Sequence, residues 1–122
     1  MCRMLAKVSS EPSSAEYELL SAPPSLSAQS LEANLPFPER PRGPHADGCG
    51  VAWLDVGRLR LETRGRTTCW DTTFINHAEK LSTSALIAHN RAASSGLVIQ
   101  KSAAHPYLGT VGNQREIGRA HV

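Results

Sequence analysis

The clearest pattern in the sequence is the alternation of polar and apolar residues over 58–64, which read Arg-Leu-Arg-Leu-Glu-Thr-Arg. A period of two predicts a β-strand with one face toward the core and one face toward water. Residues 50–54, Gly-Val-Ala-Trp-Leu, form a short apolar run, which indicates a buried strand. Residues 55–57, Asp-Val-Gly, separate the two runs, so we predict a β-hairpin with one wet face.

Two further strands and one helix are predicted from shorter patterns. Residues 2–8 and 84–89 are mostly apolar, which is typical of short strands, and residues 93–96 are expected to form a loop after the second of them. A short helix is predicted around 73–82, because residues 71–73 offer N-cap side chains. Its apolar residues recur at helical spacing: Phe74, Ala78 and Leu81.

Residues 9–44 are rich in serine, proline and glutamate. Helical order is expected only over 15–20, because the prolines that follow break any longer element. We interpret the segment as a surface excursion. A lid over a site and a plain connecting loop both fit, and the connecting loop is the commoner case.

The composition limits the classes of protein. With 122 residues, 40% of them hydrophobic, the chain is globular and forms one small domain or part of a larger one. A net charge of +2 predicts no nucleic-acid partner, and the apolar runs are too short to span a membrane. The first residues lack the apolar core of a secretory signal.

The cysteines and histidines give no metal-site spacing. Three cysteines at scattered positions argue against a disulfide framework and favour a reducing, cytoplasmic location. No pair of them has a CxxC spacing and no two histidines have an HxxxH spacing, so we predict no metal and no cofactor.

The last six residues, Ile-Gly-Arg-Ala-His-Val, can be encoded as ATC GGA AGA GCA CAC GTC, which matches a common short-read sequencing adapter in one frame. We therefore predict that 1–116 is the N-terminal part of a domain and that 117–122 is translated adapter. An unbroken gene that encodes the same tail would remove this hypothesis.

Cys2 follows the initiator methionine directly. Removal of Met1, which is normal before a small residue, leaves Cys2 with a free α-amine. An α-amine has a pKa of about 7.7–8.0 and a thiol a pKa of about 8.5, so the amine is a well-matched base for its own side chain. Nucleophiles activated in this way cleave amides. Taken alone, Cys2 is better explained as a small apolar residue that opens a buried strand.

Two other segments carry candidate residues. Residues 44–53, Pro-His-Ala-Asp-Gly-Cys-Gly-Val-Ala-Trp, place two glycines at the start of a strand, where backbone can approach closely; alone, the segment is a turn into a hairpin. Arg91 follows an apolar strand, and its planar guanidinium suits a carboxylate. A surface arginine over the sheet edge explains it equally simply.

The order of these segments resembles the class II glutamine amidotransferases, which are N-terminal-nucleophile hydrolases. Cys2 after Met1 resembles their N-terminus, and 45–52, His-Ala-Asp-Gly-Cys-Gly-Val-Ala, is similar to H-x-D-G-W-G-I-A of a subgroup that hydrolyses γ-glutamyl amides in thiol metabolism. Residues 89–96, His-Asn-Arg-Ala-Ala-Ser-Ser-Gly, are similar to H-x-R-x-A-T-x-G, and 105–107, His-Pro-Tyr, to H-P-F. The four matches span most of 1–114.

The resemblance implies an α+β fold: a four-layer α/β/β/α sandwich of two antiparallel sheets, of which this chain holds the N-terminal part. It implies that Cys2 is the nucleophile and that Arg91, helped by Ser94, binds the α-carboxylate of glutamine or of a γ-glutamyl group. It also implies a structural role, in and beside the strand that backs the site, for a further set of residues: His45, Asp47, Gly48, Gly50 and His89.

The sequence departs from the family pattern in two ways. Cys49 stands where tryptophan is usual, which loosens packing but touches no expected catalytic role. The H-N-G segment that forms the family's oxyanion hole, and a later aspartate that binds the α-amine, do not occur in the 122 residues. Because one oxyanion donor contributes about 10²–10³ in rate, we expect the polypeptide as written to be inactive, and with half of its strands, unstable.

Three functions stay open at this point. The first is a glutamine amidotransferase-like amidohydrolase that releases ammonia or passes it to a separate synthetase subunit. The second is a γ-glutamyl hydrolase that acts on a metabolite of the glutathione or ergothioneine type. The third is a non-catalytic module that binds the γ-glutamyl group without turnover, which retention of Met1 would favour.

Overall fold

The structure is a computed structural model and describes residues 3–23, 25–31, 47–65, 69–91, 104–111 and 114–118. These residues form a small α+β domain, in which a four-stranded antiparallel sheet carries two α-helices. The elements follow one another in this order: β1 (Arg3–Ser14), the π-helical turn η1 (Tyr17–Ser21), α1 (Leu26–Leu31), β2 (Gly48–Asp55), β3 (Arg58–Gly65), α2 (Thr72–Glu79), β4 (Ser82–Arg91), β5 (Tyr107–Val111) and β6 (Gln114–Gly118).

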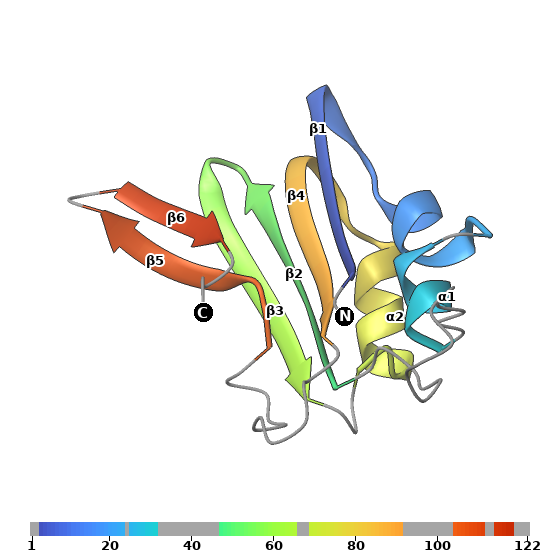
Figure 1. The fold of residues 1–122 in the computed structure, drawn as a ribbon. Helices are drawn as coiled ribbons and strands as arrows, with labels where there is room; N and C mark the ends of the chain where they lie inside the picture. The colour runs from blue at the N-terminus through green and yellow to red at the C-terminus, as the bar shows by residue number, and fades with distance from the viewer. Residues whose placement is uncertain are drawn as a thin grey trace.

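The strand order in the sheet is β1-β4-β2-β3, so β1 and β3 are the edge strands and β4 and β2 are the central ones. β4 lies between β1 and β2, and its Ala88 is paired with Leu5 on one side and with Val51 on the other. β5 and β6 form a separate two-stranded antiparallel sheet. Figure 1 shows η1, α1 and α2 gathered at one side of the four-stranded sheet and the β5–β6 hairpin at the other.

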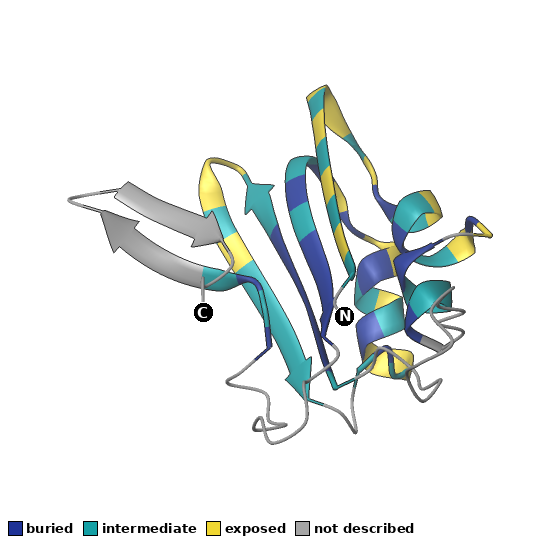
Figure 2. Cartoon of the chain, viewed as in Figure 1, coloured by how far each residue is buried: buried dark blue, intermediate teal, exposed yellow. Residues whose placement is uncertain are grey.

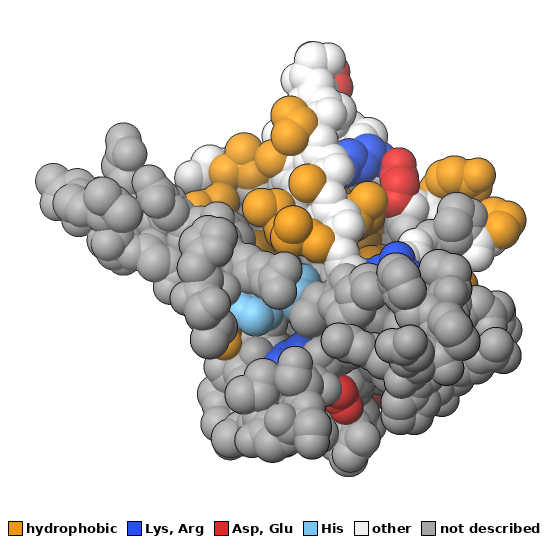
Figure 3. All heavy atoms as spheres, viewed as in Figure 1, with side chains coloured by type: hydrophobic (Ala, Val, Ile, Leu, Met, Phe, Trp, Pro, Cys, Tyr) orange, Lys and Arg blue, Asp and Glu red, His pale blue; other side chains and the backbone are white. Residues whose placement is uncertain are grey.

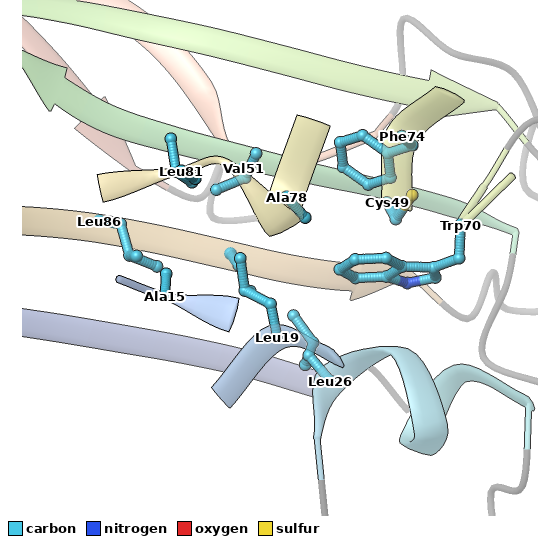
Figure 4. Close-up of a cluster of buried hydrophobic side chains, with 11 residues drawn as sticks. Ala15, Leu19, Leu26, Cys49, Val51, Trp70, Phe74, Ala78, Leu81 and Leu86 are labelled. Atoms are coloured by element: carbon cyan, nitrogen blue, oxygen red, sulfur yellow. The ribbon is translucent and has the colours of Figure 1, made fainter. Parts of the chain in front are cut away.

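The hydrophobic core fills the space between the helices and one face of the sheet (Figure 4). Strand alternation sends every second residue of β2 and β4 into this layer, where it meets the helices. The buried cluster comprises Ala15, Leu19, Leu26, Cys49, Val51, Trp70, Phe74, Ala78, Leu81, Leu86 and Ala88. Burial is deepest along the two central strands, as the dark ribbons of Figure 2 show.

The opposite face of the sheet is apolar as well. On β1, Met4 is 60% exposed and Val8 is 84% exposed, and their partners on β4 are His89 and Ala85. Hydrophobic side chains gather on this face of the molecule in Figure 3, next to histidine side chains.

The predicted hairpin is confirmed. β2 and β3 pair from Gly48 with Gly65 to Asp55 with Arg58, so both strands are longer than the patterns suggested. The prediction of a helix around 73–82 is confirmed as α2, which ends at Glu79. Asp71 is its N-cap, and the carboxylate accepts a hydrogen bond from the backbone N–H of Phe74 at 2.9 Å.

The N-terminal segment differs from the prediction. The first strand continues through Ser14, and α1 was not predicted, because the prolines after residue 20 were expected to break any further helix. The serines of 25–30 satisfy backbone groups: the Ser25 hydroxyl accepts from the N–H of Ala28 at 3.2 Å and donates to the carbonyl of Leu20 at 3.0 Å. Burial of Leu19 and Leu26 then holds the segment on the sheet. Of the segment 9–44, interpreted above as a surface excursion, residues 9–23 and 25–31 are described, and they contain the end of β1, η1 and α1. The rest of that segment and the loop predicted at 93–96 lie outside the described residues.

An ion pair ties the first strand to the turn that follows it. The Lys7 ammonium lies 3.0 Å from the Glu18 carboxylate. The hydrogen bond from Lys7 lowers the pKa of Glu18, and desolvation opposes the shift.

The β5–β6 hairpin was not predicted from the sequence. Tyr107 is paired with Gly118 and Gly109 with Glu116, so β6 includes residues on both sides of the predicted boundary at 116. Strand pairing uses backbone groups, which every residue other than proline supplies in full. The pairing therefore does not test whether 117–122 is translated adapter, and the boundary at 116 stays a prediction.

The turn between β2 and β3 contains a strained residue. Val56 has a φ of 47° and Gly57 a φ of 76°, and Val56 is almost fully exposed. Positive φ is unfavourable for a β-branched residue, whereas Asn-Gly is the preferred pair in a two-residue hairpin turn. We expect Val56→Asn to raise the free energy of unfolding by about 1 kcal/mol, measured by urea titration. Val56→Ile, which keeps the branched Cβ, serves as the control and should give no gain.

Candidate functional site

The candidate site lies at the end of the sheet where β1 and β2 begin and β4 ends. Arg3 of β1 is paired with Asn90 of β4, and Gly48 of β2 is paired with Arg91. The antiparallel order of the three strands therefore brings the start of the chain to the residues around Arg91, which is far away in the sequence.

The last residues of β4 point alternately to the two faces of the sheet. Asn90 points to the helices. Its side-chain carbonyl accepts a hydrogen bond from the indole N–H of Trp70 at 2.8 Å, and its amide donates to the carbonyl of Leu26 at 2.6 Å. Because Asn90 is fully buried and bonded on both ends, it fixes the end of β4 to the helical layer.

His89 and Arg91 flank Asn90 and belong to the opposite face. His89 is buried, and its ring lies edge-on to the ring of His105, with centroids 4.8 Å apart. Tyr107 continues the stack, with its ring 4.4 Å from that of His105. Three aromatic side chains, one from β4, one from the segment before β5 and one from the first residue of β5, thus meet on one face of the sheet.

Two glycines of β2 make room for this contact. A Cβ on Gly50 would overlap the backbone carbonyl oxygen of His105 and would lie 3.0 Å from the Thr63 methyl group. A Cβ on Gly48 would lie 3.0 Å from the Cβ of Ala104. The segment 104–105 therefore lies directly on the backbone of β2, as glycines at these positions allow.

Arg91 is a charged residue that is only 7% exposed. A guanidinium is buried at a favourable free energy only where it is hydrogen-bonded or paired with an anion. The backbone carbonyl of Arg91, the last residue of β4, accepts a hydrogen bond from the N–H of Asp47 at 2.9 Å. The backbone of Arg91 is thus held by Asp47 and by its pairing with Gly48, which fixes the point from which the guanidinium side chain extends.

The structure brings together five of the residues that sequence analysis selected: Asp47, Gly48, Gly50, His89 and Arg91. Three others, Cys2, His45 and Ser94, lie outside the described residues. Sequence analysis gave no role to Asn90, Trp70 or Tyr107, although Asn90 stands within the His-Asn-Arg motif.

The described residues hold no group of three or more His, Cys, Asp or Glu side chains that could bind a metal ion. In the described segments, none of the helices has the length and the apolar run that crossing a bilayer requires. In comparisons with known proteins, no protein-family model matches the sequence and no curated protein matches it.

Proposed function

We propose that this domain belongs to an amidohydrolase of the class II glutamine amidotransferase type, which cleaves the γ-amide of glutamine or of a γ-glutamyl compound. The observation that carries the proposal is the pairing of Arg3 with Asn90. It sets the beginning of the chain, where Cys2 is joined to Arg3, beside the strand end that holds Arg91. The proposal therefore assigns a thiol, an α-amine and a cation that suits a carboxylate to this end of the sheet.

The reaction needs three groups. The Cys2 α-amine takes the proton of the thiol, directly or through a water molecule, and the thiolate attacks the amide carbon. Ammonia or an amine leaves with that proton, and a γ-glutamyl thioester forms on Cys2. Water then hydrolyses the thioester and regenerates the thiol. Arg91 binds the α-carboxylate of the substrate, with help from Ser94.

We also propose that the four-stranded sheet is one layer of a four-layer α/β/β/α sandwich. Helices cover only one of its faces among the described residues, and the other face exposes Met4 and Val8. The segment 104–105 crosses onto that second face at Gly48 and Gly50. Packing of a second sheet on this face would bury its apolar side chains.

The proposal is tested on the product of the gene, resequenced from intact genomic DNA through codon 116. The purified protein is incubated with glutamine and with a panel of γ-glutamyl amides, and released glutamate and ammonia are measured. We expect turnover of at least one compound, and the preferred compound distinguishes a glutaminase from a γ-glutamyl hydrolase. Intact mass without Met1 is also expected. Retained Met1 together with binding but no turnover would instead identify a binding module.

Arg91→Lys tests the carboxylate contact. Lysine keeps the charge but loses the planar pair of donors, so we expect KM for the preferred substrate to rise about 10- to 100-fold with a smaller change in kcat. The matched control is a substrate whose α-carboxylate is converted to an amide, on which wild type and variant should perform equally. An unchanged KM for the unmodified substrate would rule out Arg91 as the carboxylate ligand.

A further inference from the structure

Trp70 is a buried residue with a strained backbone. It lies in the segment between β3 and α2, and its φ is 54°. A bulky residue keeps a positive φ only where its surroundings hold it there, and such residues are concentrated at functional sites. The reaction proposed above gives Trp70 no role.

Contacts on both sides hold Trp70 in this conformation. Its indole N–H donates a hydrogen bond to the side-chain carbonyl of Asn90 at 2.8 Å, and its ring packs on that of Phe74, with centroids 4.9 Å apart. Asp71, the next residue, caps α2. In Figure 4 the indole lies at the end of β4. The backbone of this segment is therefore anchored to α2, while the indole reaches the end of the sheet.

The side chain of Asn90 can make its two hydrogen bonds in one orientation only. An indole N–H only donates and a backbone carbonyl only accepts, so the amide oxygen faces Trp70 and the amide nitrogen faces Leu26. In the sheet, Asn90 is paired with Arg3 of β1 and with Cys49 of β2. Asn90 is therefore fixed within the sheet by its backbone and against the helical layer by its side chain.

Arg91 follows Asn90 and is the last residue of β4. Because side chains alternate across a strand, a tilt of the backbone at Asn90 changes the direction of the Arg91 side chain on the opposite face. Displacement of a substrate-binding group by about 1 Å can cost about 100-fold in activity. The hydrogen bonds of Asn90 thus act on the group that the proposed function assigns to the substrate carboxylate.

We propose that Trp70 and Asn90 are positioning residues, which hold the Arg91 guanidinium in the direction that binds the α-carboxylate of the substrate. This inference rests on the proposed function for the identity of that ligand. Loss of the indole N–H loosens the end of β4 while the sheet stays paired. Conversely, a carboxylate bound at Arg91 stabilises the hydrogen bond of Trp70, because coupling between two positions acts equally in both directions.

Trp70→Phe tests the proposal in the product of the resequenced gene. Phenylalanine keeps an aromatic ring beside Phe74 but removes the donor to Asn90. We expect KM for the preferred γ-glutamyl substrate to rise about 10-fold, with a smaller change in kcat. KM for the analogue whose α-carboxylate is converted to an amide should stay as in wild type, since that contact does not involve the Arg91 charge.

Trp53→Phe is the matched control. It makes the same substitution in the second of the two tryptophans, whose ring packs on that of His77 of α2 with centroids 4.9 Å apart. Both KM values should equal those of wild type. Thermal unfolding of each variant is measured as well. A fall in the unfolding temperature of Trp70→Phe with an unchanged ratio of the two KM values would mean a purely structural role and would overturn the proposal.

Nuclear magnetic resonance tests the positioning without turnover. The Nε–H signal of Arg91 is identified by its loss in Arg91→Lys, and the indole signal of Trp70 remains in Trp53→Phe, which removes the other indole. Glutamate, which carries the same α-carboxylate, is added to the wild-type protein. We expect the Arg91 signal to shift and the indole hydrogen of Trp70 to exchange with water about fivefold more slowly.

The outcomes separate this proposal from the proposed function. If glutamate shifts the Arg91 signal but leaves the exchange at Trp70 unchanged, the positioning role is overturned and the proposed function stands. If glutamate does not shift the Arg91 signal, the carboxylate contact of the proposed function is refuted. The ligand-free protein then decides the positioning role: the Arg91 signal should differ between wild type and Trp70→Phe but not between wild type and Trp53→Phe. Identical signals in all three would overturn it.

Discussion

Replacing Cys2 by alanine is expected to abolish hydrolysis of γ-glutamyl amides, by about 10⁴-fold or more, in the product of the resequenced gene. The thiol is the group that bonds to the substrate carbon in the proposed reaction, and Cys49, the thiol that the structure describes at this strand end, is fully buried in the core. Alanine is also small, so removal of Met1 and the free α-amine are preserved. The sheet should be unaffected, because the strand pairs through its backbone from Arg3 onward. Activity is measured as glutamate release and folding by circular dichroism.

Two further variants separate the thiol from the amine. Cys49→Ala and Cys69→Ala remove the other thiols and should retain hydrolysis if they fold, which shows that the loss is specific to Cys2. Insertion of a lysine between Met1 and Cys2 keeps the thiol but prevents removal of methionine, and it should also abolish turnover. Retained hydrolysis in Cys2→Ala would refute the nucleophile assignment. Retained hydrolysis in the insertion variant would refute the role of the amine.

The elements that sequence patterns predicted correctly are those fixed by neighbours in the chain. The alternation over 58–64 and the turn at Val56 and Gly57 determine the β2–β3 hairpin within a few residues. Asp71 and the helical spacing of Phe74 and Ala78 determine α2 in the same way. In the β2–β3 hairpin and in α2, the residues that determine the element are close to one another in the sequence.

The elements that were missed depend on distant partners. α1 has weak helical propensity and forms where Leu26 packs into the core and its carbonyl accepts from Asn90, 64 residues later. The serines of this segment bond to backbone and give no periodic pattern. β5 and β6 pair with each other, and the segment before them rests on Gly48 and Gly50, a contact that no local pattern encodes.

The candidate site was predictable only as a set of residues and not as an arrangement. The sequence pointed to Arg91 and to the glycines of β2, but the strand order that brings them beside β1 comes from pairing between distant residues, such as Arg3 with Asn90 and Gly48 with Arg91. Asn90 connects the candidate site to the hydrophobic core. Its side chain bonds to the helical layer, while its neighbours His89 and Arg91 face the other way, so packing of the helices sets the direction of both.

Gly50→Ala is expected to lower the free energy of unfolding by about 1–3 kcal/mol, although a glycine in a strand is normally improved by alanine. Gly50→Ala is expected to be destabilising here because the backbone carbonyl of His105 occupies the position of the new Cβ. A backbone atom cannot rotate away, so the segment 104–107 must move off β2 and break the stack of His105 on His89. The loss is measured by urea titration followed through tryptophan fluorescence, with the slope of the transition checked for two-state behaviour.

Two double variants identify the atom responsible. Thr63→Ser removes the methyl group that would lie near the new Cβ, yet it should not restore stability to Gly50→Ala, because the overlap is with backbone. In Gly48→Ala the atom nearest to the new Cβ is the Cβ of Ala104, at 3.0 Å, so the smaller loss expected there, about 1 kcal/mol, should be largely recovered by Ala104→Gly. Rescue of Gly50→Ala by Thr63→Ser, or wild-type stability of Gly50→Ala, would show that the segment does not rest on β2. The same contact holds the His105 ring against the His89 ring, so that result would also mean that His105 is not part of the candidate site.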